Sequence, residues 1–255
     1  MQTDKDSRAK HRVGVLVPFT NTNLEGDLFA LRPENIAFHF ARLGGYDVDE
    51  IPDAEQMSGL GQSDINEPLR LISGVRPDVV LYGCTSATLS IGSEFDRSLA
   101  KQIEEISGAK TITAAGAVIN ALKILKCKRL AFASPYVPAL NDEAIAFIES
   151  FGMKVVSRAD YDEPLGNYGQ GELSPNRVFD LGKEADSEEA EVILLSCTDM
   201  RAVEIIDLLE EATGKPVISS NQAMLFQTLQ MLGVEHFRSG YGRLFTHLAR
   251  AVEKV

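Results

Sequence analysis

Two cysteines of this chain, Cys84 and Cys197, stand in matching local sequences. Each follows a short apolar run and precedes a threonine, in VVLYGCTSAT (79–88) and VILLSCTDMR (192–201). A thiolate can add to an electron-poor carbon or remove a proton, and a thiol can give a proton back. Either cysteine alone could be a packing residue, because cysteine is common in buried strands. The matched pair instead predicts that the two thiols react together.

The residues after the two cysteines suit the binding of an anion. Thr85, Ser86 and Thr198 are of the types that favour helix starts. A helix start offers free N–H groups and a partial positive charge. We expect this environment to lower the pKa of both thiols and to bind a carboxylate without Lys or Arg. Cys127 has no counterpart in the other half, and we interpret it as structural.

Three further polar positions are candidates with an alternative reading each. Tyr136 follows an apolar run and could donate to an anion or enolate, or could pack at a domain edge. Asn21 could bind substrate or supply turn chemistry. The polar, glycine-rich segment 160–176 carries Asn167 and could be a mobile lid or an inert surface loop.

The elements that must position these residues alternate between strand and helix. Four nearly unbroken apolar runs predict strands buried on both faces of a parallel sheet: 13–17, 79–82, 129–133 and 192–195. Weaker strands are predicted at 46–51, 110–113, 153–157 and 216–219. Helical patterns include 94–107, 115–126, 141–151 and 201–213.

The strand order repeats along the chain. Strands near 13, 46, 79 and 110 match those near 129, 153, 192 and 216, and VGVLVPFTNTN (13–23) matches LAFASPYVPALN (130–141). This predicts an α/β fold of two pseudo-symmetric parallel-sheet domains from an internal duplication. Ligands bind beyond the carboxyl ends of such strands, so the active site is expected in the cleft between the domains.

The segment 220–255 is helical in pattern and has no evident counterpart in the first half. We expect it to pack back on that half. The predicted domains are therefore 10–115 plus 220–255, which is discontinuous, and 116–219.

Composition excludes several other classes. The net charge of −12 over 255 residues disfavours nucleic-acid binding. No apolar run approaches the roughly 20 residues of a membrane span, and the polar residues 1–12 are expected to be a disordered lead-in to a cytoplasmic protein. Three cysteines and scattered histidines predict neither a disulfide framework nor a zinc site. Motifs for nucleotides and common cofactors are absent, so we expect no cofactor and no metal.

Five ordered motifs resemble those of the maleate cis-trans isomerases. This group is a branch, with the arylmalonate decarboxylases, of the aspartate/glutamate/hydantoin racemase superfamily. The motifs are VPFTN (17–21), YGCTS (82–86), SPYVPAL (134–140), LGN (165–167) and LSCTDM (195–200), and the resemblance runs from about residue 12 to about residue 235.

The resemblance implies a role for each matched position. Cys84 would be the nucleophile and Cys197 the second thiol. Carboxylate binding would fall to Asn21, Tyr136 and Asn167, with the pocket completed by Thr85, Ser86, Thr198 and Asp199. Phe19 and Thr20 depart from the small residues usual in the family. A homodimer or higher homo-oligomer is also implied.

These observations predict a cofactor-independent cis-trans isomerase of maleate or a similar small unsaturated dicarboxylate. The alternative is a two-cysteine racemase of an amino acid, hydantoin or related acid. A further alternative is an isomerase of the ectoine-utilisation type, because segment 23–45 resembles proteins of that type. Decarboxylation is disfavoured, because the decarboxylases lack the first cysteine. A non-catalytic anion-binding protein is the remaining alternative, and its cysteines would be dispensable.

Overall fold

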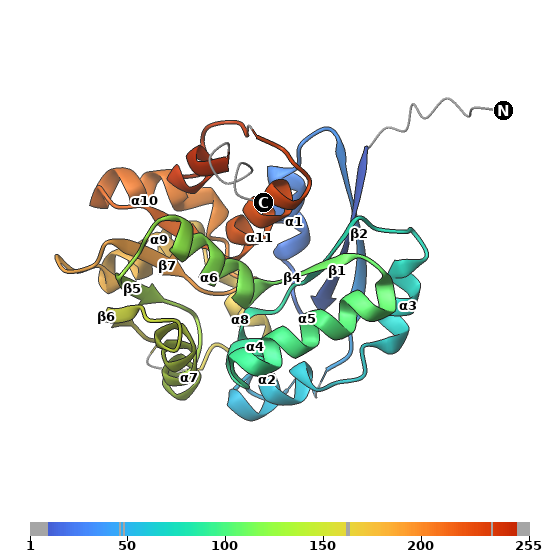
Figure 1. Cartoon of the computed structure of the whole chain (residues 1–255). Helices are drawn as coiled ribbons and strands as arrows, with labels where there is room; N and C mark the ends of the chain where they lie inside the picture. Colours follow the sequence, from blue (N-terminus) through green and yellow to red (C-terminus); the bar gives the residue numbers. More distant parts are fainter. Residues whose placement is uncertain (1–9, 46, 48, 162–163, 236, 249–255) are drawn as a thin grey trace.

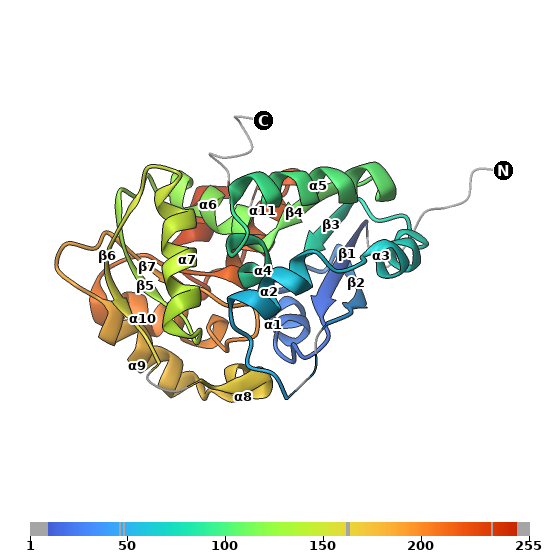
Figure 2. The same cartoon turned by 90° about the horizontal axis from the view of Figure 1, so that it is seen from below.

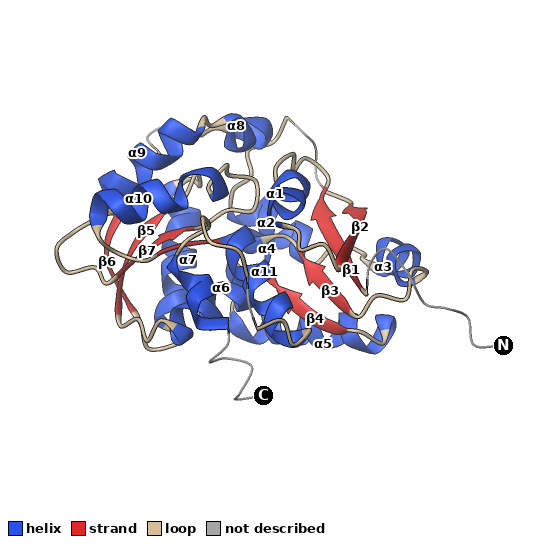
Figure 3. Ribbon diagram, turned by 90° about the horizontal axis from the view of Figure 1, so that it is seen from above, coloured by secondary structure: helices blue, strands red, loops and turns tan. Residues whose placement is uncertain are grey.

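Two parallel four-stranded sheets form the framework of the molecule (Figure 3). The computed structural model describes residues 10–45, 47, 49–161, 164–235 and 237–248. The first sheet has the order β2 (Ile36–Leu43), β1 (His11–Pro18), β3 (Val79–Tyr82), β4 (Lys110–Thr113). The second has the order β6 (Lys154–Ala159), β5 (Arg129–Ala133), β7 (Val192–Leu195), β8 (Val217–Ser219). The identical order confirms the predicted pair of α/β halves.

Helices cover both sheets (Figure 1). In the first part of the chain they are α1 (Leu24–Leu31), α2 (Ala54–Gly61), α3 (Asn66–Ser73), α4 (Thr85–Leu89), α5 (Ser93–Ser107) and α6 (Ala114–Ile124). In the second they are α7 (Pro138–Glu149), α8 (Gly166–Glu172), α9 (Pro175–Ala185), the 3₁₀ helix η1 (Val203–Ile205), α10 (Ile206–Thr213), α11 (Ser220–Met231) and the 3₁₀ helix η2 (Arg243–His247). None of the described helices has the length and apolar composition needed to cross a membrane.

The inner strands were predictable because all their side chains are buried except at the start of β1 and of β5. Strands β3 and β7 are buried along their whole length, as their unbroken apolar sequences require. Seven of the eight predicted strands are confirmed to within about two residues. The predicted lead-in 1–12 lies outside the described residues as far as residue 9, and His11 already belongs to β1.

The strand predicted at 46–51 is wrong. Residues 46 and 48 lie outside the described residues, and the described remainder of that stretch forms no strand. The second strand is β2, which pairs with β1 along eight residues, from Ile36 to Leu43. It is an edge strand whose burial is incomplete, so its sequence, IAFHFARL, mixes apolar with polar residues. That mixture lacks the continuous apolar signal of a buried strand.

The expectation that segment 220–255 has no counterpart is also wrong, because α6 follows β4 as α11 follows β8. Hydroxyl caps begin both helices: Thr113 accepts from the Gly116 N–H and Ser219 from the Gln222 N–H. The two helices pack against each other. The domain division at 115 and 219 stays a proposal, because α11 contacts both β4 and β8.

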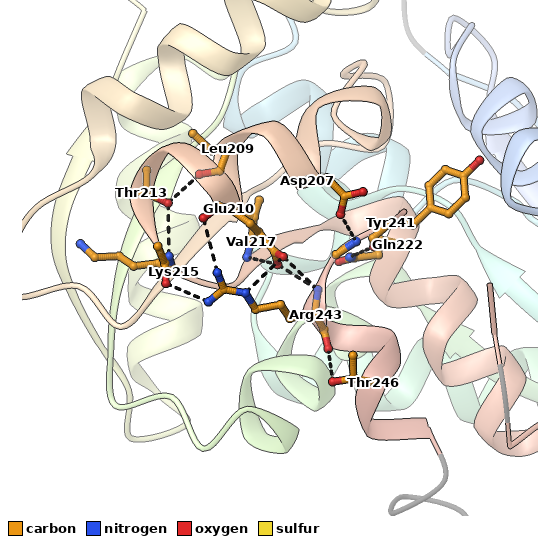
Figure 4. A network of polar contacts seen from close by, with 12 residues as sticks. Asp207, Leu209, Glu210, Thr213, Lys215, Val217, Gln222, Tyr241, Arg243 and Thr246 are labelled. Atoms are coloured by element: carbon orange, nitrogen blue, oxygen red, sulfur yellow. Dashed lines mark hydrogen bonds and ion pairs between the residues drawn. The ribbon is translucent and has the colours of Figure 1, made fainter. Parts of the chain in front are cut away.

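A buried carboxylate fastens the C-terminal segment to the second sheet (Figure 4). Glu210 on α10 accepts from the Val217 N–H at 2.9 Å and from the Arg243 N–H at 3.0 Å. Gln222 on α11 donates to the Tyr241 carbonyl at 2.6 Å. Since Glu210 is only 5 % exposed, these donors replace the water that its carboxylate would otherwise bind.

We expect Glu210→Ala to lower the free energy of unfolding by about 2 to 4 kcal/mol, because backbone N–H groups lose a charged acceptor. Denaturant titration followed by circular dichroism measures the change. Glu184→Ala is the matched control, since Glu184 forms an exposed ion pair with Arg177 and should cost less than about 1 kcal/mol. Equal effects of the two substitutions would contradict the role given to Glu210.

Candidate active site

Both cysteines lie beyond the carboxyl ends of inner strands and face one cavity. Cys84 follows β3 after one glycine, and Cys197 follows β7 after one serine. Gly83 makes the first turn possible, because a Cβ there would lie 2.4 Å from the Leu24 side chain. The cavity has about 430 Å³ of empty space, open solvent included. All nine predicted site residues line it: Asn21, Cys84, Thr85, Ser86, Tyr136, Asn167, Cys197, Thr198 and Asp199.

The thiol pKa values shift in the direction opposite to our expectation. Cys84 occupies the N-cap position of the short helix α4, and the N–H groups of Ala87 and Ser86 act to lower its pKa. Burial outweighs them and raises the pKa of the Cys84 thiol. Cys197 precedes a turn rather than a helix start. Burial, followed by the Asp199 carboxylate, raises the pKa of the Cys197 thiol. Both groups therefore favour the protonated form in the free site.

The Asp199 carboxylate joins the two halves at the cavity. Its Oδ1 accepts from the N–H groups of Thr22, at 2.8 Å, and Asn23, at 3.0 Å. The Asn23 side chain donates in turn to the Asp199 carbonyl at 2.8 Å. Burial raises the pKa of Asp199 to about 6 in spite of these donors. The predicted substrate-binding residue Asp199 thus directs its carboxylate to the first half, while its own N–H donates to Cys197 Sγ at 3.3 Å.

Asn21 and Thr198 connect the loops that carry the two cysteines. Asn21 Nδ2 donates to Thr198 Oγ1 at 3.0 Å, and Thr198 Oγ1 donates to the Gly83 carbonyl at 2.9 Å. Asn21 Oδ1 accepts the Leu24 N–H at the start of α1. The amide of Asn21 is therefore oriented from both sides, which fixes its position at the cavity wall.

Arg42 supports this loop from the end of β2 and was missed from the sequence. Its guanidinium donates to the carbonyls of Pro18, at 3.1 Å, and Asn21, at 2.6 Å, and pairs with Glu25. Placing the second strand at 46–51 removed the signal that could have found it, namely a basic residue at the carboxyl end of a strand.

Both thiols contribute to the electrostatic environment of Tyr136. Its phenol is buried, and its hydroxyl hydrogen-bonds to Cys197 in the direction that stabilises a thiolate. Burial, then the nearby Cys197 and Cys84, raises the pKa of Tyr136. The phenol therefore keeps its proton and can donate it in a hydrogen bond. Ser134 Oγ accepts the Tyr136 N–H at 3.1 Å and holds the loop.

Helix α8 extends from the second half toward the first (Figure 2), and its residues Asn167 and Gln170 line the cavity. Asn167 Nδ2 donates to the Glu50 carbonyl of the first half at 2.6 Å. Gln170 Oε1 accepts from Cys197 Sγ at 3.6 Å, and sequence reasoning missed this residue. The segment 160–176 is thus not one irregular loop, because it holds α8 and the first residues of α9. Its proposed movement as a lid stays a prediction.

The cavity lining combines apolar and polar residues. The apolar ones are Pro18, Phe19, Pro52, Met57 and Leu60. Thr85 Oγ1 donates to Ser220, and Ser86 Oγ donates to Met57 Sδ at 3.0 Å. Lys, Arg and His are absent from the cavity lining among the described residues. In the same part of the chain, no group of three or more His, Cys, Asp or Glu could hold a metal ion.

A family model for arylmalonate decarboxylase matches residues 13–245. The chain belongs to this family. A maleate isomerase of Pseudomonas putida is 27 % identical over 249 residues, which cover 92 % of this chain and 97 % of the relative. The crystal structure of a maleate isomerase from Pseudomonas putida S16 superposes with a TM-score of 0.84 at 25 % identity, over 94 % of this chain and 99 % of that chain.

A third relative shows the same fold with a modified cysteine. A mutant of the Nocardia farcinica maleate cis-trans isomerase carries a covalently bound succinylcysteine intermediate. It superposes with a TM-score of 0.82 at 22 % identity, over 92 % of this chain and 98 % of that chain. The predicted branch of the superfamily is confirmed.

We expect Gly171→Ala to displace α8 from the first half. A Cβ at this position would lie 2.7 Å from Thr22 Oγ1 and 2.8 Å from Asp199 Oδ2. Labelling of Cys197 by a bulky maleimide, followed by peptide mass spectrometry, should become several-fold faster. Gly169→Ala is the control on the same helix, because its Cβ would meet Leu165 at 3.2 Å, well away from the interface. Equal labelling rates in both variants would show that α8 does not shield Cys197.

Proposed function

We propose that this protein is a cofactor-independent cis-trans isomerase of maleate or a similar small unsaturated dicarboxylate. The observation that carries the proposal is one cavity lined by two thiols from equivalent loops, surrounded by neutral hydrogen-bond donors. The full-length similarity to maleate isomerases supports the substrate class. The succinylcysteine of the Nocardia farcinica relative is the adduct that a thiol and maleate would form, and it supports covalent catalysis.

The first step is the addition of Cys84 to the alkene. Cys84 first loses its proton to solvent, and its thiolate then forms a C–S bond with one alkene carbon. The π electrons move to the other carbon and its carboxylate as an enediolate. The Ser86 hydroxyl, 3.7 Å from Cys84 Sγ, and the N–H groups of Ser86 and Ala87 would stabilise the attacking thiolate. Tyr136 and the loop N–H groups would stabilise the negative charge of the enediolate.

The second thiol completes the isomerisation. Cys197, whose raised pKa keeps it protonated, gives its proton to the carbon next to the new C–S bond. The former double bond is now single and can rotate. The Cys197 thiolate then takes the same proton back, and the C–S bond breaks with its electrons returning to Cys84. The trans product leaves, and both thiols regain their starting states.

Neutral donors would bind the substrate carboxylates in this scheme. Asn21, Tyr136 and Asn167 are the proposed side-chain ligands, together with the N–H groups beside the two cysteines. Asp199 would act by holding the first-half loop and not by touching substrate, because its Oδ1 already accepts two backbone N–H groups. These two N–H donors offset part of the negative charge of the carboxylate and so limit its repulsion of an anionic ligand.

Localisation in the cytoplasm and assembly as a homodimer or higher homo-oligomer are part of the proposal. Three free thiols support a reducing compartment. The net charge of −12 supports the expectation that nucleic acid is no partner.

Cys84→Ser and Cys197→Ser should each reduce the formation of fumarate from maleate by at least about 100-fold, because each removes one of the reacting groups. Proton NMR follows the alkene signals directly. Cys127→Ser is the matched control and should keep its activity, since Cys127 lies away from the cavity. Mass spectrometry of Cys197→Ser incubated with maleate should show one substrate bound to the peptide that contains Cys84.

Two results would contradict the isomerase. The first is wild-type protein that forms no fumarate at high enzyme concentration. The second is full activity in both serine variants. Solvent deuterium at the α-carbon of a chiral amino acid, without reaction of maleate, would establish the racemase instead.

We expect kcat/KM for maleate to rise with pH across the neutral range. A thiol whose folded pKa is raised is mostly protonated at neutral pH, and its thiolate fraction grows about tenfold per pH unit below that pKa. Initial rates from about pH 6 to about pH 9 measure the slope, and kcat/KM reports the free enzyme. A flat profile would show that the Cys84 thiolate already predominates at neutral pH.

A further inference from the structure

A buried polar pair lies behind the second cysteine and is used by none of the steps above. Asn221, near the start of α11, is 1 % exposed, and Asp27 on α1 is 7 % exposed. Asn221 Nδ2 donates to Asp27 Oδ2 at 2.7 Å and to the Thr198 carbonyl at 3.0 Å. These contacts join a first-half helix, the last long helix and the peptide that follows Cys197.

The orientation of the Asn221 amide is what the pair determines. Both hydrogens of its NH₂ group are used, whereas its Oδ1 is buried without a hydrogen-bond partner. An ionised carboxylate can only accept hydrogen bonds, so Asp27 admits the NH₂ side of the amide and repels the oxygen. Burying the Asn221 carbonyl oxygen without a partner is unfavourable. This cost accompanies the orientation in which the NH₂ group donates to the Thr198 carbonyl.

The Thr198 peptide is the point where both cysteine loops meet. Its side chain bonds to Asn21 and to the carbonyl of Gly83, which precedes Cys84. The next N–H in the chain, that of Asp199, donates to Cys197 Sγ. A carbonyl that moved away from Asn221 would rotate this peptide and weaken the donor to the thiolate.

We propose that Asp27 and Asn221 are positioning residues for Cys197, acting through the Thr198 carbonyl. The inference deepens the proposed function and rests on the role of Cys197 as its second thiol. The pair touches neither the substrate nor the thiol. It holds the peptide whose neighbouring N–H stabilises the Cys197 thiolate when that thiolate forms.

Protonation of Asp27 would allow the Asn221 amide to change its orientation. Burial raises the pKa of Asp27 to about 7, and the charged groups facing it are Asp199, Arg201 and Glu204, of which the last two pair with each other at 2.8 Å. Above this pKa the carboxylate is ionised and accepts from the NH₂ group. Below it, Asp27 can donate its proton to Asn221 Oδ1, which allows the amide to turn over and turns its oxygen toward the Thr198 carbonyl.

The test measures the reactivity of each cysteine and needs no substrate. Iodoacetamide alkylation is followed by peptide mass spectrometry, which separates Cys84, Cys127 and Cys197. In Asn221→Asp, an isosteric change that removes the NH₂ group, alkylation of Cys197 should slow by about fivefold or more, with Cys84 unchanged within about twofold. Asn120→Asp is the matched control, because Asn120 bonds Gln230 of the same helix α11 away from the cavity.

Exchanging the two side chains distinguishes an effect on the position of Cys197 from an effect on the stability of the protein. The double variant Asp27→Asn with Asn221→Asp keeps one carboxylate and one amide in contact, so its unfolding temperature should return toward that of wild type. The carboxylate would now face the Thr198 carbonyl, so the alkylation of Cys197 should stay slow. Recovery of Cys197 reactivity together with stability would overturn the proposal, as would an unchanged rate in Asn221→Asp.

The pH dependence of Cys197 alkylation in Asp27→Asn supplies a second readout. The ratio of the Cys197 alkylation rate in wild type to that in Asp27→Asn should fall as the pH drops through about 7. A ratio that does not change with pH would overturn the coupling of Asp27 to Cys197. These results hold whether or not maleate is converted, so they are distinct from a failure of the proposed isomerisation.

Discussion

The hydrogen bonds between the Asp199 carboxylate and the N–H groups of Thr22 and Asn23 are the contact on which the site depends. They tie a loop of the second sheet to a loop of the first. Together with the contacts of Thr198 to Asn21 and Gly83, they set the spacing of the two cysteines. A carboxylate with backbone donors fixes distance and direction at once, because the N–H groups cannot turn as side chains do. Gly171 allows α8 to reach the same point.

The surroundings of the cavity show how anionic chemistry can proceed without a basic residue. Burial makes every negative charge unfavourable there, which is why the pKa values of both thiols and of Asp199 are raised. Oriented N–H and O–H groups offset this only for the charge they point at. The cavity therefore selects an anion by the direction of its donors and not by its net charge. A small rotation of a single peptide has a large effect on the stabilisation of that anion.

The sequence predicted much of this arrangement because the duplication leaves its record in paired motifs. The strand–Cys–Thr units made Cys84 and Cys197 a pair, and all nine predicted site residues line the cavity. Gln170 and Arg42 escaped prediction, since their roles arise only when distant segments meet. The predicted direction of the thiol pKa shifts was wrong. A local helix start is visible in the sequence, whereas the depth of burial of each thiol depends on the other half.

The packing of α6 against α11 has a consequence for the order in which the protein can form. Helix α6 is synthesised before all four strands of the second sheet, whereas its partner α11 follows that sheet. Asn221 lies on α11 and emerges with it. Both sheets can therefore form while the two thiols are still unaligned. Alignment of the thiols is delayed until α11 has packed against α6.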